Sequence, residues 1–502
     1  MKKTISLLLS LILCVSFCAC ELTDTYPVSE VGGGATQEQE KQTSLEQISL
    51  IYFDDKGLHP LLETSHANRQ VNQSIYQPAF TFDESLGIQY GCATSVSING
   101  KSITITPDTS RRFSDNSALT PNLMADSFQF VIDHPESPYY RQLANIESVS
   151  VQSGMVKLHL KQEDPAALYC LDIPIVKQDK DNYYGCGDYM LSKFQNVPAL
   201  VANPHSPTPP VLAPITLLDP ATESAMASMF NSGVLDALSS DMMASGTLSI
   251  SREYKKASYL TNTMLFIGIN AQKSDLNTQM RQALSALMPR QDIVESVLMG
   301  DGIATTHPFY PKWNVLPQEN VNTLDKTKLL EAFEKAGLKA KNGELFTAEG
   351  EKPSFELLIS ENNKTHAAAA EKLRSAAAAL GLEITPVTVS QETFIRRLQN
   401  GNFDLYIARY TLNSDMNPTP LFTAESEYNY GAFDLPELST AWDGWKKGEK
   451  TMEEYLSLFD KYCPILPIAF VKNTLYYTDG ITTAGHISAS SPLGNLSRWS
   501  TK

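Results

Sequence analysis

Residues 112–131, R-F-S-D-N-S-A-L-T-P-N-L-M-A-D-S-F-Q-F-V, carry more information about the fold than any other stretch of the chain. Thr120 is a residue type that caps helix N-termini. Pro121 suits the first helical position, because the N–H that it lacks has no helical partner there. Taken alone, the stretch predicts an ordinary helix that begins at Pro121 after a polar turn.

A second informative region lies between residues 354 and 407, where strand and helix patterns alternate. Strands are predicted at 355–359, 384–389 and 401–407, and helices at 367–380, which Gly381 ends, and at 391–398. Consecutive strands joined by helices pair in parallel through right-handed crossovers. Ligands of such sheets bind beyond the carboxyl ends of the strands, so the segment after Ile407 is expected to border a site.

Several segments together resemble a known family. Residues 112–131 are similar to the F-S-D-G-x-P-L-T-A-x-D-V signature of the extracytoplasmic solute-binding proteins of ABC importers, in their peptide- and nickel-binding branch. Residues 281–294, R-Q-A-L-S-A-L-M-P-R-Q-D-I-V, resemble a second family phrase, with Pro289 in place of the usual Asp. Residues 465–470 resemble the family's returning strand. No single block is specific, but they occur in the family's order from about residue 49 to 480.

The resemblance implies an α/β fold, a two-lobed, periplasmic-binding-protein-like (type II) clamp. A two-strand hinge, near residues 250–254 and at 465–470, would join the lobes, and the first lobe would carry a small extra subdomain. The predicted domains are a lipoprotein signal peptide at 1–20, a flexible tether at 21–47, lobe I at 48–250 and 470–502 with its subdomain at about 77–165, and lobe II at 251–469.

The amino end predicts where the protein works. Lys2 and Lys3 precede an apolar run from residue 5 to 19, which is too short to span a bilayer and has the form of a secretion signal. The run ends in F-C-A-C, which resembles a lipobox with Cys20 as the lipidated residue, Cys18 being a second candidate. The alternative is a plain signal peptide cut elsewhere. We therefore expect a protein anchored by lipid to the cell membrane on its extracytoplasmic face.

Charge and cysteine content exclude several functions. The formal charge is −16, and loss of Lys2 and Lys3 with the signal makes it −16 − 2 = −18, which argues against nucleic acid as a partner. Cys92, Cys170, Cys186 and Cys463 show no C-x-x-C spacing, so no zinc or redox motif is indicated, and no disulfide pairing follows from the sequence. Because catalytic and phosphate-binding motifs are missing as well, we expect no enzyme, metal or cofactor.

Two loops supply the candidate ligand-binding residues. Residues 410–418 follow the third strand, and the resemblance implies that Asp415, or Ser414 if Pro418 sets the alignment, pairs with a ligand's α-amino group; the alternative is a simple Asx turn. Residues 184–189 resemble a glycine loop that approaches an extended ligand, and the alternative is an ordinary turn. The full set of candidates is Tyr410, Asn413, Ser414, Asp415, Asn429, Tyr430, Gly185, Cys186 and Gly187.

The function implied by the resemblance is capture of short peptides or similar amine-bearing solutes between two lobes. The partners would be the permease and ATPase subunits of an ABC importer, and we expect the binding protein to be a monomer. The alternative is a surface lipoprotein that uses the same scaffold to sense peptides or to interact, without transport.

Overall fold

The computed structural model describes residues 47–53, 58–220, 222–240, 250–361 and 363–502. The predicted signal peptide, Cys20 and the tether up to residue 46 lie outside these ranges. Helix α2, Pro121–Asp133, begins where the sequence predicts: the Thr120 side chain accepts a hydrogen bond from the Leu123 N–H, and Pro121 occupies the first turn. None of the helices in the described ranges combines the length and apolar content needed to cross a bilayer.

One core organises the elements that we call lobe I. It includes Leu50, Phe128 and Trp499 and takes residues from both ends of the described chain. Its two four-stranded sheets have the orders β1-β12-β11-β10 and β4-β5-β7-β6, and α2 packs against the second. The elements are β1 Ser49–Ile51, α1 His66–Ile75, β2 Phe80–Phe82, β3 Ile88–Tyr90, β4 Ala93–Asn99, β5 Ser102–Pro107, α2, β6 Ile146–Gln152, β7 Met155–Leu160, β8 Lys177–Asp179, β9 Asn182–Tyr184, β10 Tyr189–Phe194, β11 Val197–Ala202, β12 Ile215–Leu218, α3 Glu223–Asn231, β13 Ala237–Ser239, β22 Ile481–Thr482 and β23 Ser500–Thr501.

A second, larger core defines lobe II, and it includes Phe309, Leu357 and Leu466. Its sheet has the order β13-β21-β14-β20-β18-β19, with β15 also paired to β21. The elements are β14 Lys255–Ile269, α4 Thr278–Leu287, α5 Arg290–Asp292, β15 Gly302–Ala304, α6 Lys326–Lys335, β16 Lys339–Lys341, β17 Glu344–Phe346, β18 Ser354–Ser360, α7 Lys364–Ala378, β19 Glu383–Val389, α8 Gln391–Gln399, β20 Leu405–Thr411, α9 Pro436–Lys446, α10 Met452–Tyr462 and β21 Ile465–Tyr477.

The alternating region of lobe II folds as the sequence predicts. Strand β18 pairs in parallel with both β19 and β20, and α7 and α8 form the connections between these strands. Gly381 adopts a φ of +74° after α7, a conformation that glycine reaches without strain. The carboxyl ends of β18, β19 and β20 therefore meet at one edge of the sheet.

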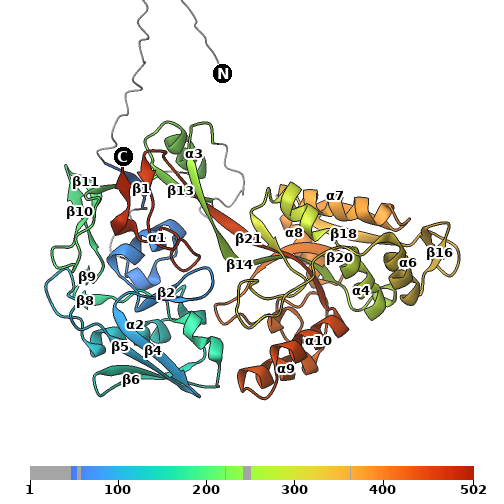
Figure 1. The fold of residues 1–502 in the computed structure, drawn as a ribbon, viewed down its shortest axis with the longest axis horizontal. Helices are drawn as coiled ribbons and strands as arrows, with labels where there is room; N and C mark the ends of the chain where they lie inside the picture. Colours follow the sequence, from blue (N-terminus) through green and yellow to red (C-terminus); the bar gives the residue numbers. More distant parts are fainter. Residues whose placement is uncertain (1–46, 54–57, 221, 241–249, 362) are drawn as a thin grey trace, which may run out of the picture. The chain divides into compact units, whose positions relative to one another are not determined.

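Two long strands run between the cores. Strands β14 and β21 pair antiparallel along most of their length and can be followed side by side in Figure 1. Residues 465–471 of β21 belong to the core of lobe II, whereas Leu475 and Tyr477 belong to that of lobe I. The sequence predicted the first crossing strand near residues 250–254. In the structure this strand is β14, which begins at Lys255, so the predicted position lies just before the strand. The predicted lobe boundaries themselves stay a prediction.

Glu84, in the turn between β2 and β3, makes three contacts with lobe II. Its carboxylate accepts a hydrogen bond from the Leu260 N–H at 3.1 Å and pairs with the Lys312 ammonium. Its backbone carbonyl accepts a hydrogen bond from the Tyr310 hydroxyl at 2.9 Å. All three partners lie on or near the crossing strands, so this turn fixes lobe I to lobe II beside the crossing.

Helices α9 and α10 pack against one another, and their aromatic residues are structural. Trp442 is buried and stacks on Trp445, with ring centroids 4.8 Å apart. Trp442 belongs to the core of lobe II, and Trp445 packs against that core. Thr451 and Glu454 form a reciprocal capping box at the start of α10.

Candidate functional site

Strand β20 leads from the core of lobe II to the candidate site. Leu405, Tyr406 and Ile407 are buried in the sheet, and the residues after them become more accessible toward Thr411. The strand is flanked by β18 in parallel and by β14 antiparallel. Residues 408–418 therefore emerge at the sheet edge where ligands of parallel sheets bind.

A pocket of about 450 Å³ opens beside this edge within lobe II. Arg409 and Tyr410 from β20, His366 from α7, and Tyr428 and Tyr430 from the loop before α9 contribute to its wall. Ser360, Asn363, Gln391, Phe394 and seven further residues complete the lining. The wall thus combines aromatic rings with a guanidinium, an imidazole and amide groups, as small-molecule sites commonly do.

The imidazole of His366 is buried in this wall, and neither of its ring nitrogens has a hydrogen-bond partner among the described residues. Burial, with a contribution from the nearby Arg409 charge, lowers the pKa of His366 to about 3. The ring is therefore neutral near pH 7 and offers one N–H donor. Arg409 is exposed and forms no ion pair with another residue of the described ranges, so its charge is available to a ligand anion.

The four tyrosines that line the pocket pack as two pairs. The Tyr410 and Tyr428 rings meet edge to face with centroids 5.5 Å apart, and Tyr430 packs against Tyr406 in the same manner at 6.1 Å. The Tyr428 hydroxyl accepts a hydrogen bond from Arg141 of lobe I at 3.2 Å. This pocket therefore extends to the boundary between the lobes.

Asp415 lies in the loop that continues from β20. Its carboxylate accepts a hydrogen bond from the Asn417 N–H at 3.2 Å, the geometry of an Asx turn. Burial raises the pKa of Asp415, although that hydrogen bond and the Lys446 ammonium oppose the shift. Asp415 and the buried Asp164 of lobe I repel one another electrostatically, and burial raises the pKa of Asp164 to about 6. Negative charge from both lobes thus converges on this loop.

Ser414 and Met416, the neighbours of Asp415, line a cavity of about 160 Å³ between the lobes. Gln142, Asp172 and Tyr169 of lobe I line its other side. The side-chain oxygen of Gln142 is buried without a hydrogen-bond partner in the described structure. Because a buried acceptor without a donor is costly, Gln142 is suited to receive a donor group from a ligand.

The remaining sequence candidates occupy other places. Asn413 is exposed, and its carbonyl accepts a hydrogen bond from the Met416 N–H. The Asn429 amide donates to the Thr423 and Phe433 carbonyls and accepts from the Phe433 N–H, so it shapes its own loop. Tyr410, Tyr430 and Ser414 therefore line cavities, Asp415 lies beside one, and Asn413 and Asn429 line neither of the two.

The loop of Gly185, Cys186 and Gly187 packs closely on the protein's own backbone. A Cβ added at Gly185 would lie 1.8 Å from the Ile75 carbonyl oxygen, and one at Gly187 would lie 2.1 Å from that of Ser74. The Gly187 N–H donates to the Ile75 carbonyl at 2.9 Å. The absence of side chains at Gly185 and Gly187 thus lets this loop pack against the end of α1. None of the three residues lines a cavity described here.

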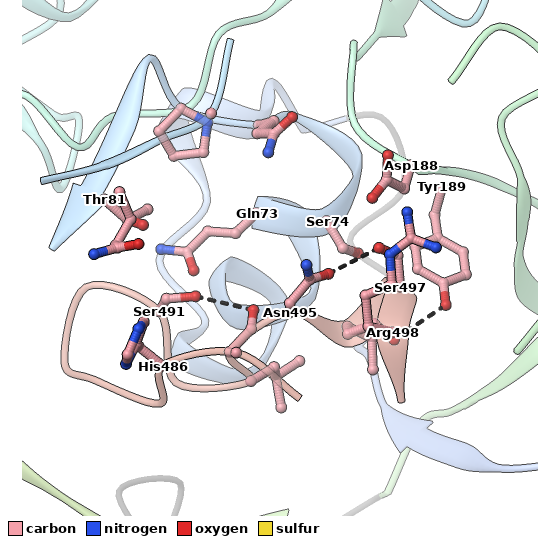
Figure 2. Close-up of a pocket in the computed structure, with 18 of the residues that line it drawn as sticks. Gln73, Ser74, Thr81, Asp188, Tyr189, His486, Ser491, Asn495, Ser497 and Arg498 are labelled. Carbon is pink, nitrogen blue, oxygen red and sulfur yellow. Dashed lines mark hydrogen bonds between the residues drawn. The ribbon is translucent and has the colours of Figure 1, made fainter. Parts of the chain in front are cut away.

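A further pocket, of about 390 Å³, lies within lobe I and is polar (Figure 2). Gln73 and Ser74 of α1 face Asn495 and Ser497 of the carboxyl-terminal segment across it. The Ser497 hydroxyl donates to Asn495 at 2.8 Å, and the Tyr189 hydroxyl donates to the Leu496 carbonyl at 3.4 Å. None of the residues predicted from the sequence to bind ligand lines this pocket.

Sequence reasoning missed His366, Arg409 and Gln142. Arg409 carried a usable signal, because a charged residue near the carboxyl end of a predicted parallel strand is placed at the site by the sheet rule. His366 and Gln142 reach their cavities only through tertiary packing. Within the described ranges, no group of three or more His, Cys, Asp or Glu residues is arranged to hold a metal ion.

Known proteins resemble this chain in sequence and in fold. The family model described as "Bacterial extracellular solute-binding proteins, family 5 Middle" matches residues 87–432. The oligopeptide-binding protein AppA of Bacillus subtilis (strain 168) is 25% identical over 210 residues, which are 40% of this chain and only 37% of that relative's length.

Two solved structures share the fold. The periplasmic murein tripeptide binding protein MppA, in its unliganded open form, has a TM-score of 0.72 at 18% identity, over 91% of this chain and 98% of that one. A nickel ABC transporter structure from Bacillus halodurans has a TM-score of 0.70 at 17% identity, over 89% and 96% of the two chains. These likenesses confirm the predicted two-lobed α/β fold.

Proposed function

Because the chain belongs to the bacterial extracellular solute-binding proteins of family 5, we propose that it captures short peptides, or similar amine-bearing solutes, and delivers them to the permease of an ABC importer. As a member of that family it is a substrate-binding component of the peptide and nickel importers. The identity of the ligand, the delivery step and the lipid anchor at Cys20 are parts of the proposal.

The observation that carries the peptide assignment is the separation of charge at the end of β20. Arg409 and His366 offer a cation and a neutral N–H donor to a carboxylate in the lobe II pocket. Asp415, six residues farther along the chain, offers a carboxylate to an ammonium. A short peptide carries both of these groups at its ends, and charge-assisted hydrogen bonds to them are stronger than neutral ones.

The position of the site between two cores suits capture by closure. Tyr428 of lobe II and Arg141 of lobe I meet at the pocket, and residues of both lobes line the smaller cavity beside Ser414. A clamp of this kind removes water from its ligand when it closes, which strengthens the electrostatic interactions inside. The residues that we assign to the ligand are Asp415, Ser414, Tyr410, Tyr430, Arg409 and His366, with Asn413 and Asn429 supporting their loops.

Isothermal titration calorimetry with peptides of two to five residues tests this assignment. Saturable binding, together with a smaller radius of gyration in X-ray scattering on addition of peptide, is the expected result. Identification of co-purifying ligands by mass spectrometry gives the natural cargo. Absence of any peptide among them, with no heat of binding, would contradict the proposal.

Transport and anchoring are tested separately. Loss of peptide uptake in cells that lack the protein, and co-purification with permease subunits, would support import. Retained uptake would favour the alternative of a sensing or interaction lipoprotein. Substitution of Cys20 by Ala should release the protein from membranes into the soluble fraction, whereas a Cys18→Ala substitution should leave it anchored.

A further inference from the structure

The polar pocket of lobe I is separate from the site proposed for peptides. Within the described ranges it shares no lining residue with the lobe II pocket, and only the buried Phe82 with the cavity between the lobes. Its walls come from α1, from β2 and β3, and from the carboxyl-terminal segment. Its volume of about 390 Å³ lies within the range of small-molecule sites, roughly 300–1,000 Å³. The pocket therefore has room for a ligand of its own.

One face of α1 supplies amides and a hydroxyl to this pocket. Gln70, Gln73 and Ser74 have the spacing of a single helix face, and Gln77 lies two residues past the end of the helix. Gln70 is only 3% exposed. Burial of polar groups is costly unless they are hydrogen-bonded, so this wall suits a polar ligand better than an apolar one.

Two of these glutamine amides are held in place through one of their two polar atoms. The Gln73 nitrogen donates to the Ser490 carbonyl at 2.9 Å. The Gln77 oxygen accepts from the Arg111 guanidinium at 2.7 Å. These bonds fix the amides and leave the Gln73 oxygen as an acceptor and the Gln77 N–H groups as donors for a ligand.

Asn495 repeats this arrangement on the facing wall. Its oxygen accepts from the Ser497 hydroxyl at 2.8 Å, which leaves the Asn495 N–H groups as donors. Figure 2 shows Asn495 across the pocket from Gln73 and Ser74. Donors and acceptors are thus presented from two walls at fixed positions, which suits a ligand whose groups both donate and accept.

The charged groups of the wall balance one another. Arg111, Arg498 and Asp188 line the pocket. The Arg111 side chain lies 3.5 Å from the Asp108 carboxylate, so one of the two cations already has a counterion. Asp188 has the opposite sign to the other cation. An ionic ligand therefore gains no advantage from net charge in this wall.

An aromatic ring completes the lining. Tyr90, at the end of β3, lines the pocket although it is 49% exposed. An aromatic ring offers a large apolar face with a polar tip. The pocket thus joins one apolar face to an array of amides and hydroxyls.

We propose that the lobe I pocket binds a neutral sugar of one or two rings. Each sugar hydroxyl both donates and accepts hydrogen bonds, as the facing amides require, and the C–H face of a sugar ring packs on an aromatic ring such as Tyr90. An apolar ligand would leave the amides without partners, which is unfavourable. The site is independent of the one proposed for peptides.

Saturation-transfer NMR on the purified protein tests the proposal, with glucose, N-acetylglucosamine, maltose and cellobiose as probes. At least one of these sugars should receive saturation from the protein. The Arg409→Gln substitution in lobe II should leave this binding unchanged, whether or not peptides bind. The absence of transfer to all four sugars would overturn the proposal, as would loss of sugar binding in Arg409→Gln, which would place the sugar in the lobe II pocket.

Two substitutions in the pocket locate the site. Gln73→Met and Asn495→Leu should each raise the dissociation constant of the bound sugar by roughly threefold to tenfold, the value of one neutral hydrogen bond. Gln178→Met, at an exposed position on β8, is the matched control and should change it by less than about twofold. Circular dichroism checks that the variants are folded.

Two outcomes of these measurements would contradict the assignment. Equal affinities of both pocket variants and the control would place the sugar elsewhere. Displacement of the sugar by an equal concentration of inorganic phosphate would show an anion site instead of a sugar site.

Discussion

The imidazole of His366 lies within electrostatic reach of the Arg409 guanidinium, in one pocket wall, and both groups lack a carboxylate partner in the described structure. Two nitrogen-bearing groups that face a cavity without an anion between them are poised to receive one. The His366 imidazole is already buried without a hydrogen-bond partner before a ligand binds. A ligand carboxylate that accepts its N–H would therefore add a hydrogen bond without a further cost of burying the ring. This relationship predicts a preference for ligands with a free carboxylate.

Substitution of Arg409 by Gln should weaken binding of a peptide with a free carboxyl terminus by roughly tenfold to a hundredfold, the usual value of a charge-assisted hydrogen bond. The same substitution should change the affinity for the carboxyl-amidated peptide by less than about threefold. Calorimetry on both peptides measures the difference. Arg396, on the exposed face of α8, provides the matched Arg→Gln control. Equal losses for the two peptides would show that Arg409 does not contact the carboxylate.

Substitution of Asp415 by Asn should weaken binding of a peptide with a free amino terminus by at least about tenfold, because a partly buried ammonium would lose its charged partner. An amino-acetylated peptide should be affected little. Asp434, which is exposed in the loop before α9, supplies the control Asp→Asn substitution. Since burial raises the pKa of Asp415, wild-type affinity should also fall on acidification at a pH above the usual carboxylate range. Unchanged affinity in the variant would move the amine contact to a neighbour such as Ser414.

A histidine in lobe II predicts a pH dependence of stability. His307 hydrogen bonds to Glu319 at 2.9 Å and lies 3.3 Å from Asp460. Burial alone would lower its pKa, but these two carboxylates outweigh burial and raise it to about 9.

The folded-state pKa of His307 exceeds the unfolded value near 6.5, so its stabilising contribution is complete below that pH and is lost as pH rises through 9. Because Asp460 is largely exposed, we expect a loss of about 2 kcal/mol rather than the full linkage value. Urea unfolding of wild type and His307→Gln from pH 6 to 10 should show the two free energies converging at high pH. A constant difference would show that His307 does not titrate in this range.

Close packing of the 185–187 loop predicts a large effect of a single methyl group. Gly187→Ala should destabilise the fold by about 3 kcal/mol, because its Cβ would collide with the Ser74 backbone, which has little freedom to move. Gly444→Ala is the control. Gly444 lies within helix α9, and its added Cβ would contact only the flexible side chain of Lys450, so stability should be unchanged or slightly increased. Thermal unfolding compares the two, and a similar effect of both substitutions would contradict the packing argument.

Local patterns predicted much of the fold. The Thr120–Pro121 helix start and the alternating strands and helices around α7 follow from residue order within short windows, and the structure reproduces them. The start of the crossing strand was misplaced because Lys255, Lys256 and Ser258 at the head of β14 are polar and none of residues 255–258 is buried, which weakens the alternation that marks a strand.

The site was less accessible to sequence reasoning. The strand pattern predicted that the segment after Ile407 borders the site, and that rule needs no tertiary information. The choice of Asp415 or Ser414 within that segment came from the resemblance to the family. His366 and Arg409 lie far apart in the sequence and meet only through packing of α7 on the sheet. The Gly185 and Gly187 pattern did signal a close backbone approach, but which backbone approaches them is a non-local property that no motif contains.

Strand β21 places side chains in both cores, with Val471 in one and Leu475 and Tyr477 in the other. Successive residues of a strand point to opposite faces, so one amino acid inserted after Val471 would turn everything downstream outward. Evolution can thus lengthen or shorten this connection only by even steps, or by adding a compensating bulge. In related sequences, insertions and deletions should therefore be rare within β21 and more frequent in the turns around it.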